Sequence, residues 1–173
     1  MGKLNKLGKL SKTAKANYLL IGSGRTARHF SHYFQALGSI SFDHWNRQEP
    51  ITLLLSNLER ASHVLLLISD SAIEAFYRQH LLGFSGQVLH FSGALELPDV
   101  KSAHPLMTFA PDLYDLETYR QIPFVTTSTA VTLPGLPNPV YRIRPEQKPL
   151  YHALCVMSGN FTTLLWQKMG QGL

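Results

Sequence analysis

Short apolar runs alternate with longer segments of helical periodicity between residues 17 and 91. The apolar runs lie at 18–21, 40–45, 63–68 and 87–91, and each has the length of a buried strand. Between them, residues 27–37, 51–60 and 71–82 repeat apolar positions at steps of three and four, as helices packed on one face do. The run at 63–68 is apolar on both faces, which is typical of a central parallel strand. This alternation predicts βαβ units and an α/β fold of the Rossmann-like, doubly wound kind, with a mainly parallel sheet.

The chain after residue 91 is less regular. Residues 103–109 and 124–127 are candidate strands, and 140–143 is a candidate edge strand within a proline-rich stretch at 130–149. A last helix at 150–169 is so apolar that we expect it to pack on the domain or on a second copy of the chain. We therefore expect a basic tail at 1–16, a Rossmann-like domain at 17–148 and a C-terminal helix at 149–173.

The net charge of +5 comes from the first residues of the chain. Lysine recurs there at every third position (Lys3, Lys6, Lys9, Lys12 and Lys15), and no acidic residue lies among them. The remainder of the chain is neutral, and without a basic cluster it is not expected to bind nucleic acid. We expect a solvated tail, with a weak contact to an anionic surface as the alternative.

Several other kinds of site are not expected. The chain has a single cysteine, Cys155, which excludes an internal disulfide and a cysteine metal cluster. A single cysteine also fits a reducing, cytoplasmic location. We interpret Cys155 as a packing residue. The histidines lack metal-ligand spacing, so no metal is expected. No apolar run is long enough to span a membrane. Neither a G-x-S-x-G nor a G-x-x-x-x-G-K-[ST] motif occurs.

A glycine motif stands directly between the first strand and the first helix. Residues 22–27 (Gly-Ser-Gly-Arg-Thr-Ala) match the pattern G-x-G-x-x-G/A of dinucleotide sites. Gly22 allows a tight turn, Gly24 lets the backbone approach a pyrophosphate, and Ala27 allows close packing of helix on strand. The free amides of the helix N-terminus favour a diphosphate there, so Ser23, Arg25 and Thr26 are candidate cofactor-binding residues. A plain glycine turn is the alternative.

The end of the second strand indicates which dinucleotide would bind. An NAD site would carry Asp or Glu at this point to bind the ribose 2′-hydroxyl. The sequence has Asn46 and Arg47 instead, with Asp43 as the nearby acid. A guanidinium offers a fork of donors to a 2′-phosphate, so we predict NADP(H), bound by Arg47 with help from Asn46 and Arg25. A solvated Arg47 with no such role is the alternative.

Several later segments, taken with the glycine motif, carry a resemblance to a known family. They are the Ser-Gly-Ala at 92–94, the His-Pro-Leu-Met-Thr-Phe at 104–109, and the Tyr-His-Ala at 151–153 followed by Asn160. In this order they resemble the Rossmann-like proteins with a DUF2520 domain, distant relatives of pyrroline-5-carboxylate reductase, 6-phosphogluconate dehydrogenase and other β-hydroxyacid dehydrogenases.

The resemblance implies an NADP-binding domain followed by a helical, dimerising domain, with the substrate between the two. It places Ser69 and Asp70 near the nicotinamide ribose and Ser92 and Gly93 beside the substrate. Two departures stand out. The chain ends after the first helix of the expected helical domain, which would leave that domain incomplete, and residues 133–139 are proline-rich where relatives have a helix.

Three residues are candidate catalytic groups. His104 precedes a proline, so it should lie in extended chain at a strand end, where open α/β sheets bind ligands. His152 and Asn160 are eight residues apart and would share a face of the last helix. His104 would be the acid/base, with His152 and Asn160 orienting the substrate. Structural roles for His104 and Asn160 are the alternatives.

These observations lead to two functional hypotheses. The first is an NADP(H)-dependent oxidoreductase, or its cofactor-binding domain, acting on a small carbonyl, imine or hydroxyl substrate as a homodimer formed through the C-terminal helix. The second is a non-catalytic NADP(H)-binding sensor or dimerising scaffold. A Rossmann-like site for another nucleotide is less favoured, because Asn46 and Arg47 would then lack a purpose.

Overall fold

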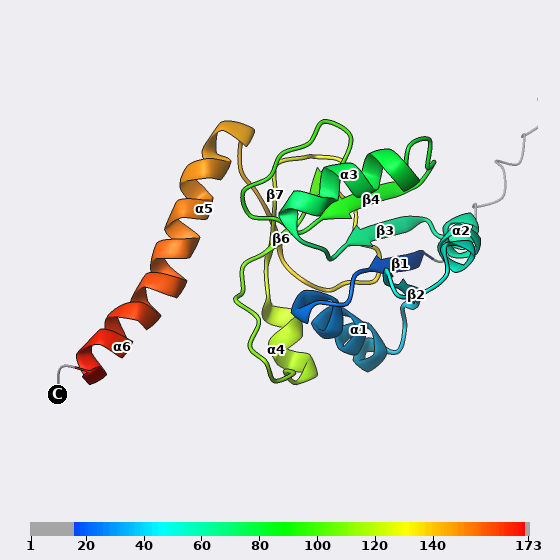
Figure 1. The fold of residues 1–173 in the computed structure, drawn as a ribbon. Helices are drawn as coiled ribbons and strands as arrows, with labels where there is room; N and C mark the ends of the chain where they lie inside the picture. Colours follow the sequence, from blue (N-terminus) through cyan, green and yellow to red (C-terminus); the bar gives the residue numbers. More distant parts are fainter. Residues whose placement is uncertain (1–15, 172–173) are drawn as a thin grey trace, which may run out of the picture.

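The computed structural model describes residues 16–171, so the expected lysine tail lies almost wholly outside the described residues. Its centre is a five-stranded, all-parallel sheet in the order β2-β1-β3-β4-β5 (Figure 1). The strands are β1 (Asn17–Ile21), β2 (Ser41–Trp45), β3 (His63–Leu66), β4 (Gln87–His90) and β5 (Lys101–Ser102). Helices α1 (Arg25–Leu37), α2 (Ile51–Arg60) and α3 (Asp70–His80) connect the first four strands. The predicted Rossmann-like fold is confirmed.

Side chains alternate between the two faces of β1, which places the strand between two cores. Tyr18 and Leu20 join the core under α1, whereas Leu19 and Ile21 join the core under α2 and α3. All four are buried, because a strand covered by helices on both faces has no exposed side. The uninterrupted apolar run in the sequence therefore reflects burial on both sides.

The connecting helices begin and end near the predicted positions. Gly38 ends α1 in the left-handed conformation, with φ at 65°, and its amide bonds back to the last turn. At α3, Ser69 is the N-cap and makes no side-chain hydrogen bond to the helix. The helix also carries Glu74, which pairs with Arg78 one turn later at 2.7 Å. That contact follows the favourable i,i+4 spacing of opposite charges.

A smaller sheet lies beside the main one and is built from the irregular part of the chain. It consists of β6 (His104–Pro105), β7 (Phe124–Thr126) and β8 (Val140–Arg142), with β6 and β7 antiparallel and β7 and β8 parallel. Strands β7 and β8 agree with the expected strands at 124–127 and 140–143, whereas the strand expected at 103–109 is reduced to the two residues of β6. Helix α4 (Leu116–Gln121), which the sequence did not suggest, precedes β7 and contacts α1. Its N-cap Asp115 accepts a hydrogen bond from the amide of Thr118 at 2.7 Å.

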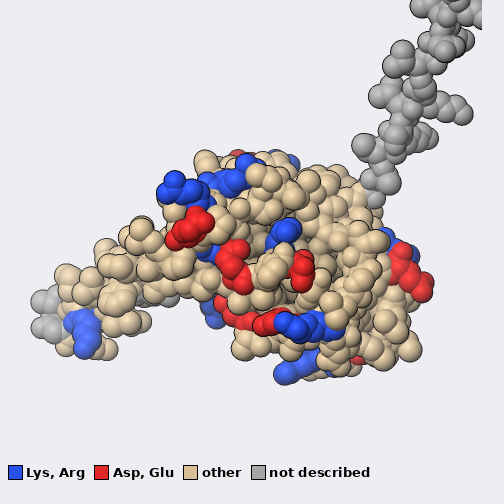
Figure 2. Space-filling view, turned by 90° about the horizontal axis from the view of Figure 1, so that it is seen from above, with Lys and Arg blue, Asp and Glu red and all other residues tan. Residues whose placement is uncertain are grey.

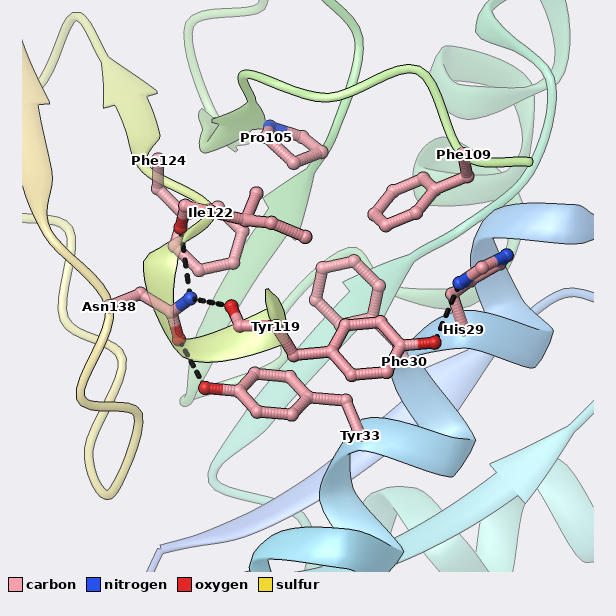
Figure 3. Close-up of a pocket in the computed structure, with 9 residues that line it drawn as sticks. All are labelled: His29, Phe30, Tyr33, Pro105, Phe109, Tyr119, Ile122, Phe124 and Asn138. Carbon is pink, nitrogen blue, oxygen red and sulfur yellow. Dashed lines mark hydrogen bonds between the residues drawn. The ribbon is translucent and has the colours of Figure 1, made fainter. Parts of the chain in front are cut away.

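Asn138 joins the proline-rich stretch to the core (Figure 3). It accepts a hydrogen bond from the hydroxyl of Tyr33 at 2.7 Å and donates to the carbonyls of Tyr119 and Ile122 at 2.7 and 2.9 Å. The void beside it holds about 10 Å³ and is walled chiefly by rings such as Phe30. This space is no larger than one water, so we interpret it as a packing defect rather than a ligand site.

The C-terminal helix extends away from the rest of the molecule (Figure 1). It consists of a 3₁₀ turn (Pro145–Gln147), α5 (Lys148–Val156), a π-helical turn (Met157–Phe161) and α6 (Thr162–Gln171). Most of its large apolar side chains are exposed, and Trp166 reaches 75%. Figure 2 shows this arm with few charged side chains along it. The helix was expected to pack on the domain or on a second copy of the chain. The domain covers only the beginning of the helix.

Candidate cofactor crevice and adjoining histidine pocket

A crevice of about 520 Å³ opens at the carboxyl ends of β1, β2 and β3. The chain runs from β1 to β2 on one side and then crosses to β3 on the other, which makes this the switch point where doubly wound sheets bind ligands. The crevice is lined by Ile21, Gly22, Ser23, Gly24, Arg25, Thr26, Trp45, Asn46, Arg47, Leu67, Ile68, Ser69, Ala72, Phe76 and His80. The lining includes all the predicted cofactor-binding residues except Asp70.

The two glycines of the motif differ in what surrounds them. Gly22 has φ at 138°, and a Cβ there would overlap the backbone of Leu67. Gly24, the N-cap of α1, has no atom within 4 Å of an added Cβ. The first turn of α1 has neither a side-chain cap nor an acidic residue. Its amides and the open space at Gly24 therefore fit a bound diphosphate, as the sequence predicts.

The turn after β2 presents Arg47 at the rim of the crevice. Asn46 is already engaged within that turn, because its Oδ1 accepts from the amide of Gln48 at 3.0 Å and its Nδ2 donates to Glu49 at 3.4 Å. Glu49 also accepts from the backbone amide of Asn46 at 2.8 Å. The sequence analysis considered Asp43 as the nearby acid and missed Glu49; Asp43 instead pairs with Arg60 at 3.2 Å. Asn46 thus shapes the turn that displays Arg47.

The crevice wall is positively charged. Arg25 and Arg47 line it, and none of its lining residues carries a carboxylate. Arg25 donates to the carbonyl of Phe109 at 3.1 Å, which fixes it at the edge of the crevice. This charge pattern fits a phosphorylated ligand.

A second pocket, of about 340 Å³, adjoins the crevice. Arg25 and Thr26 line both cavities. The remaining lining residues of this second cavity, which we call the histidine pocket, are Phe91, His104, Pro105, Met107, Thr108 and Phe109. A molecule in the histidine pocket would therefore lie next to a dinucleotide bound at the glycine turn.

His104 lies at the start of β6, in the extended chain that Pro105 imposes. The pKa of His104 is lowered to about 4, mainly by burial and then by the charges of His152 and Lys148, with Asp70 opposing the shift. Its Nδ1 is 2.7 Å from the hydroxyl of Tyr151. The ring is therefore neutral at pH 7 and held from one side.

Ser92 and Gly93, the predicted substrate-binding residues, follow β4. The Ser92 hydroxyl donates to Asp70 at 2.5 Å and accepts from the amide of Leu95 at 2.9 Å. Asp70 therefore faces this loop rather than the crevice. A Cβ on Gly93 would overlap His152 and lie 3.0 Å from Nε2 of His104. Gly93 thus lies against both histidines, and the Ser92 hydroxyl is engaged by Asp70 and Leu95.

His152 lies in α5, and the structure brings it beside His104, with ring centroids 6.2 Å apart. Its Nδ1 is buried and has no hydrogen-bond partner among the described residues. Asn160 lies in the π-helical turn, which interrupts the α-helical register assumed between it and His152. The side chain of Asn160 lies outside the described part, so its role stays a prediction.

An ion pair between a buried lysine and a partly exposed glutamate holds α5 against the domain, and sequence reasoning did not find it. Lys148 is 2% exposed; it contacts Glu96 at 2.6 Å and donates to the carbonyl of Leu95. Burial lowers the pKa of Lys148, and Glu96 opposes that shift. A lysine in the first turn of a helix meets an unfavourable helix dipole. A lysine at this unfavourable position was the one signal in the sequence that a specific acidic partner stabilises it.

His90, at the end of β4, is also part of this region. It is fully buried; Nδ1 accepts from the amide of Ser92 at 3.3 Å, and Nε2 has no partner within the described residues. Burial is the main cause that lowers the pKa of His90 to about 4, followed by the charge of Lys148. We interpret His90 as a structural histidine.

Within residues 16–171, no three His, Cys, Asp or Glu side chains converge on a point that could hold a metal ion. Over the same range, no helix has the length and apolar character needed to cross a membrane.

Comparisons with known proteins show the fold. No protein-family model and no curated protein matches the chain. A solved structure described as a putative NADP oxidoreductase from Bacteroides fragilis has a TM-score of 0.66 at 20% identity, over 88% of this chain and 70% of that one. A solved protein from Thermotoga maritima has a TM-score of 0.57 at 23% identity, over 86% of this chain and 65% of that one. The resemblance to the DUF2520 proteins stays a prediction.

Proposed function

We propose that the chain binds NADP(H) in the crevice and belongs to an oxidoreductase. The observation that carries the proposal is the open N-terminus of α1 at Gly24, facing a crevice lined by Arg25 and Arg47 and by no carboxylate. The diphosphate would lie on the amides after Gly24, and Arg47 would take the 2′-phosphate. The name of the Bacteroides protein supports the same cofactor.

Titration of NADPH and NADH on the wild type and on Arg47→Ala tests the cofactor preference. We expect Arg47→Ala to weaken NADPH by about tenfold, as loss of a charge-assisted contact does, and to leave NADH unchanged. Arg142→Ala, at an exposed position of β8, is the matched control. An unchanged preference in Arg47→Ala would remove the 2′-phosphate assignment.

Gly24→Val tests the diphosphate position separately. The added side chain meets no protein atom near its Cβ, so the fold should remain intact. It would occupy the space assigned to the diphosphate, and both cofactors should lose affinity. Tight NADPH binding by a folded Gly24→Val protein would contradict the proposal.

The histidine pocket is the proposed substrate site. When bound, NADPH supplies a hydride that reduces the substrate carbon, leaving NADP⁺. His104 would take up a proton from solvent and pass it to the substrate oxygen or nitrogen, returning to the neutral ring, and His152 and Asn160 would orient the substrate. Gly93 packs against the two histidines, Ser69 lines the crevice, and Asp70 holds Ser92 beside Gly93. NADPH oxidation with a panel of small oxo acids, aldehydes and cyclic imines is the assay, with His104→Gln as the inactive variant.

A non-catalytic NADP(H) sensor is the second candidate. The engagement of Asp70, Ser92 and Asn46 in internal hydrogen bonds favours it, since these side chains then offer few donors to a substrate. Cofactor binding in the micromolar range without turnover of any compound in the panel would favour the sensor.

The exposed face of α5 and α6 supports a homodimer. Leu150 and Leu154 on α5, and Phe161 and Leu165 from the end of the π-helical turn onward, are each more than half exposed, and each pair is four residues apart. We expect a dimer by sedimentation at micromolar concentration, and a monomer in Leu154→Glu with Leu165→Glu. The double variant Thr163→Glu with Gln167→Glu controls for the added charge. A wild-type monomer would remove this assignment.

A further inference from the structure

Tyr151 reaches from the first turn of α5 to the imidazole of His104, 47 positions earlier in the chain. The two rings meet edge to face, with centroids 5.6 Å apart and planes at 81°. The hydroxyl lies 2.7 Å from Nδ1, a short distance for a neutral hydrogen bond. The phenol therefore holds a specific nitrogen of His104.

We assign the hydroxyl as the donor in this contact, whose direction depends on the tautomer of His104. Burial raises the pKa of Tyr151, as does the neighbouring Cys155 thiol, so the phenol keeps its proton. That single proton can go to Nδ1 or to the sulfur, and an imidazole nitrogen is a much better acceptor than sulfur. With Nδ1 as the acceptor, the neutral ring of His104 carries its proton on Nε2.

Nε2 is the ring nitrogen that Tyr151 leaves free, and no described side chain makes a hydrogen bond to it. It lies against Gly93, where an added Cβ would be 3.0 Å away. His104 itself lines the histidine pocket, so a substrate bound there would approach this ring. Lys148 anchors the same turn of α5 to Glu96 and so fixes the position of Tyr151.

We propose that Tyr151 is a positioning residue that fixes His104 as the Nε2–H tautomer, and that the substrate therefore presents an acceptor oxygen, a carbonyl, to this N–H. This inference rests on the proposed oxidoreductase function. A hydrogen bond from Nε2–H polarises a C=O group toward hydride attack, as an oxyanion donor does. A protonated imine has no lone pair on nitrogen and would face the N–H with a like-signed N–H group.

The tautomer can be measured without any substrate. In the ¹⁵N-labelled full chain, two-bond proton–nitrogen correlation separates protonated from unprotonated ring nitrogens, and His104→Gln identifies the signal. We expect a protonated Nε2 and an unprotonated Nδ1 at pH 7. A protonated Nδ1 in the wild type would overturn the proposal, whether or not the protein proves to be an enzyme.

Tyr151→Phe removes the hydroxyl and keeps the ring. We expect His104 to become a mixture of both tautomers and kcat/KM for the carbonyl substrate to fall about tenfold, the worth of one hydrogen bond, with KM for NADPH unchanged. Tyr141→Phe, at an exposed position of β8, should change neither readout. An unaltered tautomer in Tyr151→Phe would overturn the role of Tyr151.

The substrate class is tested in the same enzyme panel. We expect turnover of 2-oxo acids or aldehydes at least tenfold above that of cyclic imines such as pyrroline carboxylates. Preferred reduction of imines, with NADPH bound as proposed, would overturn the assignment of a carbonyl substrate. Failure to bind NADPH would remove the proposed function and leave the tautomer result standing, so the two failures are distinguishable.

Discussion

The crevice and the histidine pocket share a wall but are built in different ways. The crevice is formed by turns whose residues are close in sequence, such as Gly22 to Thr26 and Asn46 to Glu49. The histidine pocket depends on contacts between distant segments, such as Tyr151 with His104 and Lys148 with Glu96. A local site tolerates changes elsewhere in the chain, whereas a site held by distant contacts fails when one of them is lost.

The sharpest contrast is expected between the two glycines of the crevice. Gly22→Ala should cost about 4 kcal/mol of unfolding free energy, since it adds strain at positive φ to overlap with the backbone of Leu67. Gly24→Ala should change stability by less than about 0.5 kcal/mol, as surface changes do. Urea unfolding of both variants measures the difference. Equal losses would mean that the turn has a different backbone conformation.

Glu96→Gln tests how firmly α5 is held. It leaves the buried ammonium of Lys148 without its carboxylate, so we expect a loss of about 3 kcal/mol in the free energy of unfolding. Because the anchor lies beside Tyr151, the tautomer of His104 should also become mixed. Glu117→Gln, which breaks an exposed pair with Arg120, is the control and should cost almost nothing. A small loss in Glu96→Gln would show that α5 is held by other contacts.

Acid should weaken the region around the histidine pocket through His90. The folded state lowers the pKa of His90 to about 4, whereas the unfolded chain has the usual value near 6.5. Between these values the unfolded state binds more protons, so stability is complete above pH 6.5 and falls as the pH drops toward 4. The loss amounts to about 3 kcal/mol for a fully buried histidine. His104 has a similarly lowered pKa and contributes over the same range, so His90→Gln should reduce this pH dependence in urea unfolding without abolishing it. An unchanged slope would contradict the assignment.

Ser92→Ala should have the smallest effect, although Ser92 lies beside both histidines. It removes the hydroxyl that bonds Asp70 and the amide of Leu95, for a loss of about 1 kcal/mol. Ser128→Ala, which removes a similar bond to the amide of Ala130 in an exposed loop, is the matched control. If Ser92→Ala abolished turnover with NADPH binding intact, the hydroxyl would have a direct role in substrate binding.

Most of the main sheet could be predicted because its signals are local. The run from His63 to Ile68 predicted the central strand β3 and overran its end by two residues, because the chain remains apolar after β3 ends. Helix α4 escaped prediction because its six residues are too few to show a period. Glu49 was missed because a turn, rather than a strand, brings it back to Asn46.

By itself, the sequence determined the parallel sheet, the glycine turn and the place of Arg47, because each follows from the conformational limits and periodicity of neighbouring residues. Only the tertiary structure decided that Tyr151 holds His104, that Lys148 pairs with Glu96 and that α5 and α6 remain uncovered by the domain. These contacts join segments about 50 residues apart, and loop closure over such lengths is set by the packing of the whole domain, which no local pattern encodes.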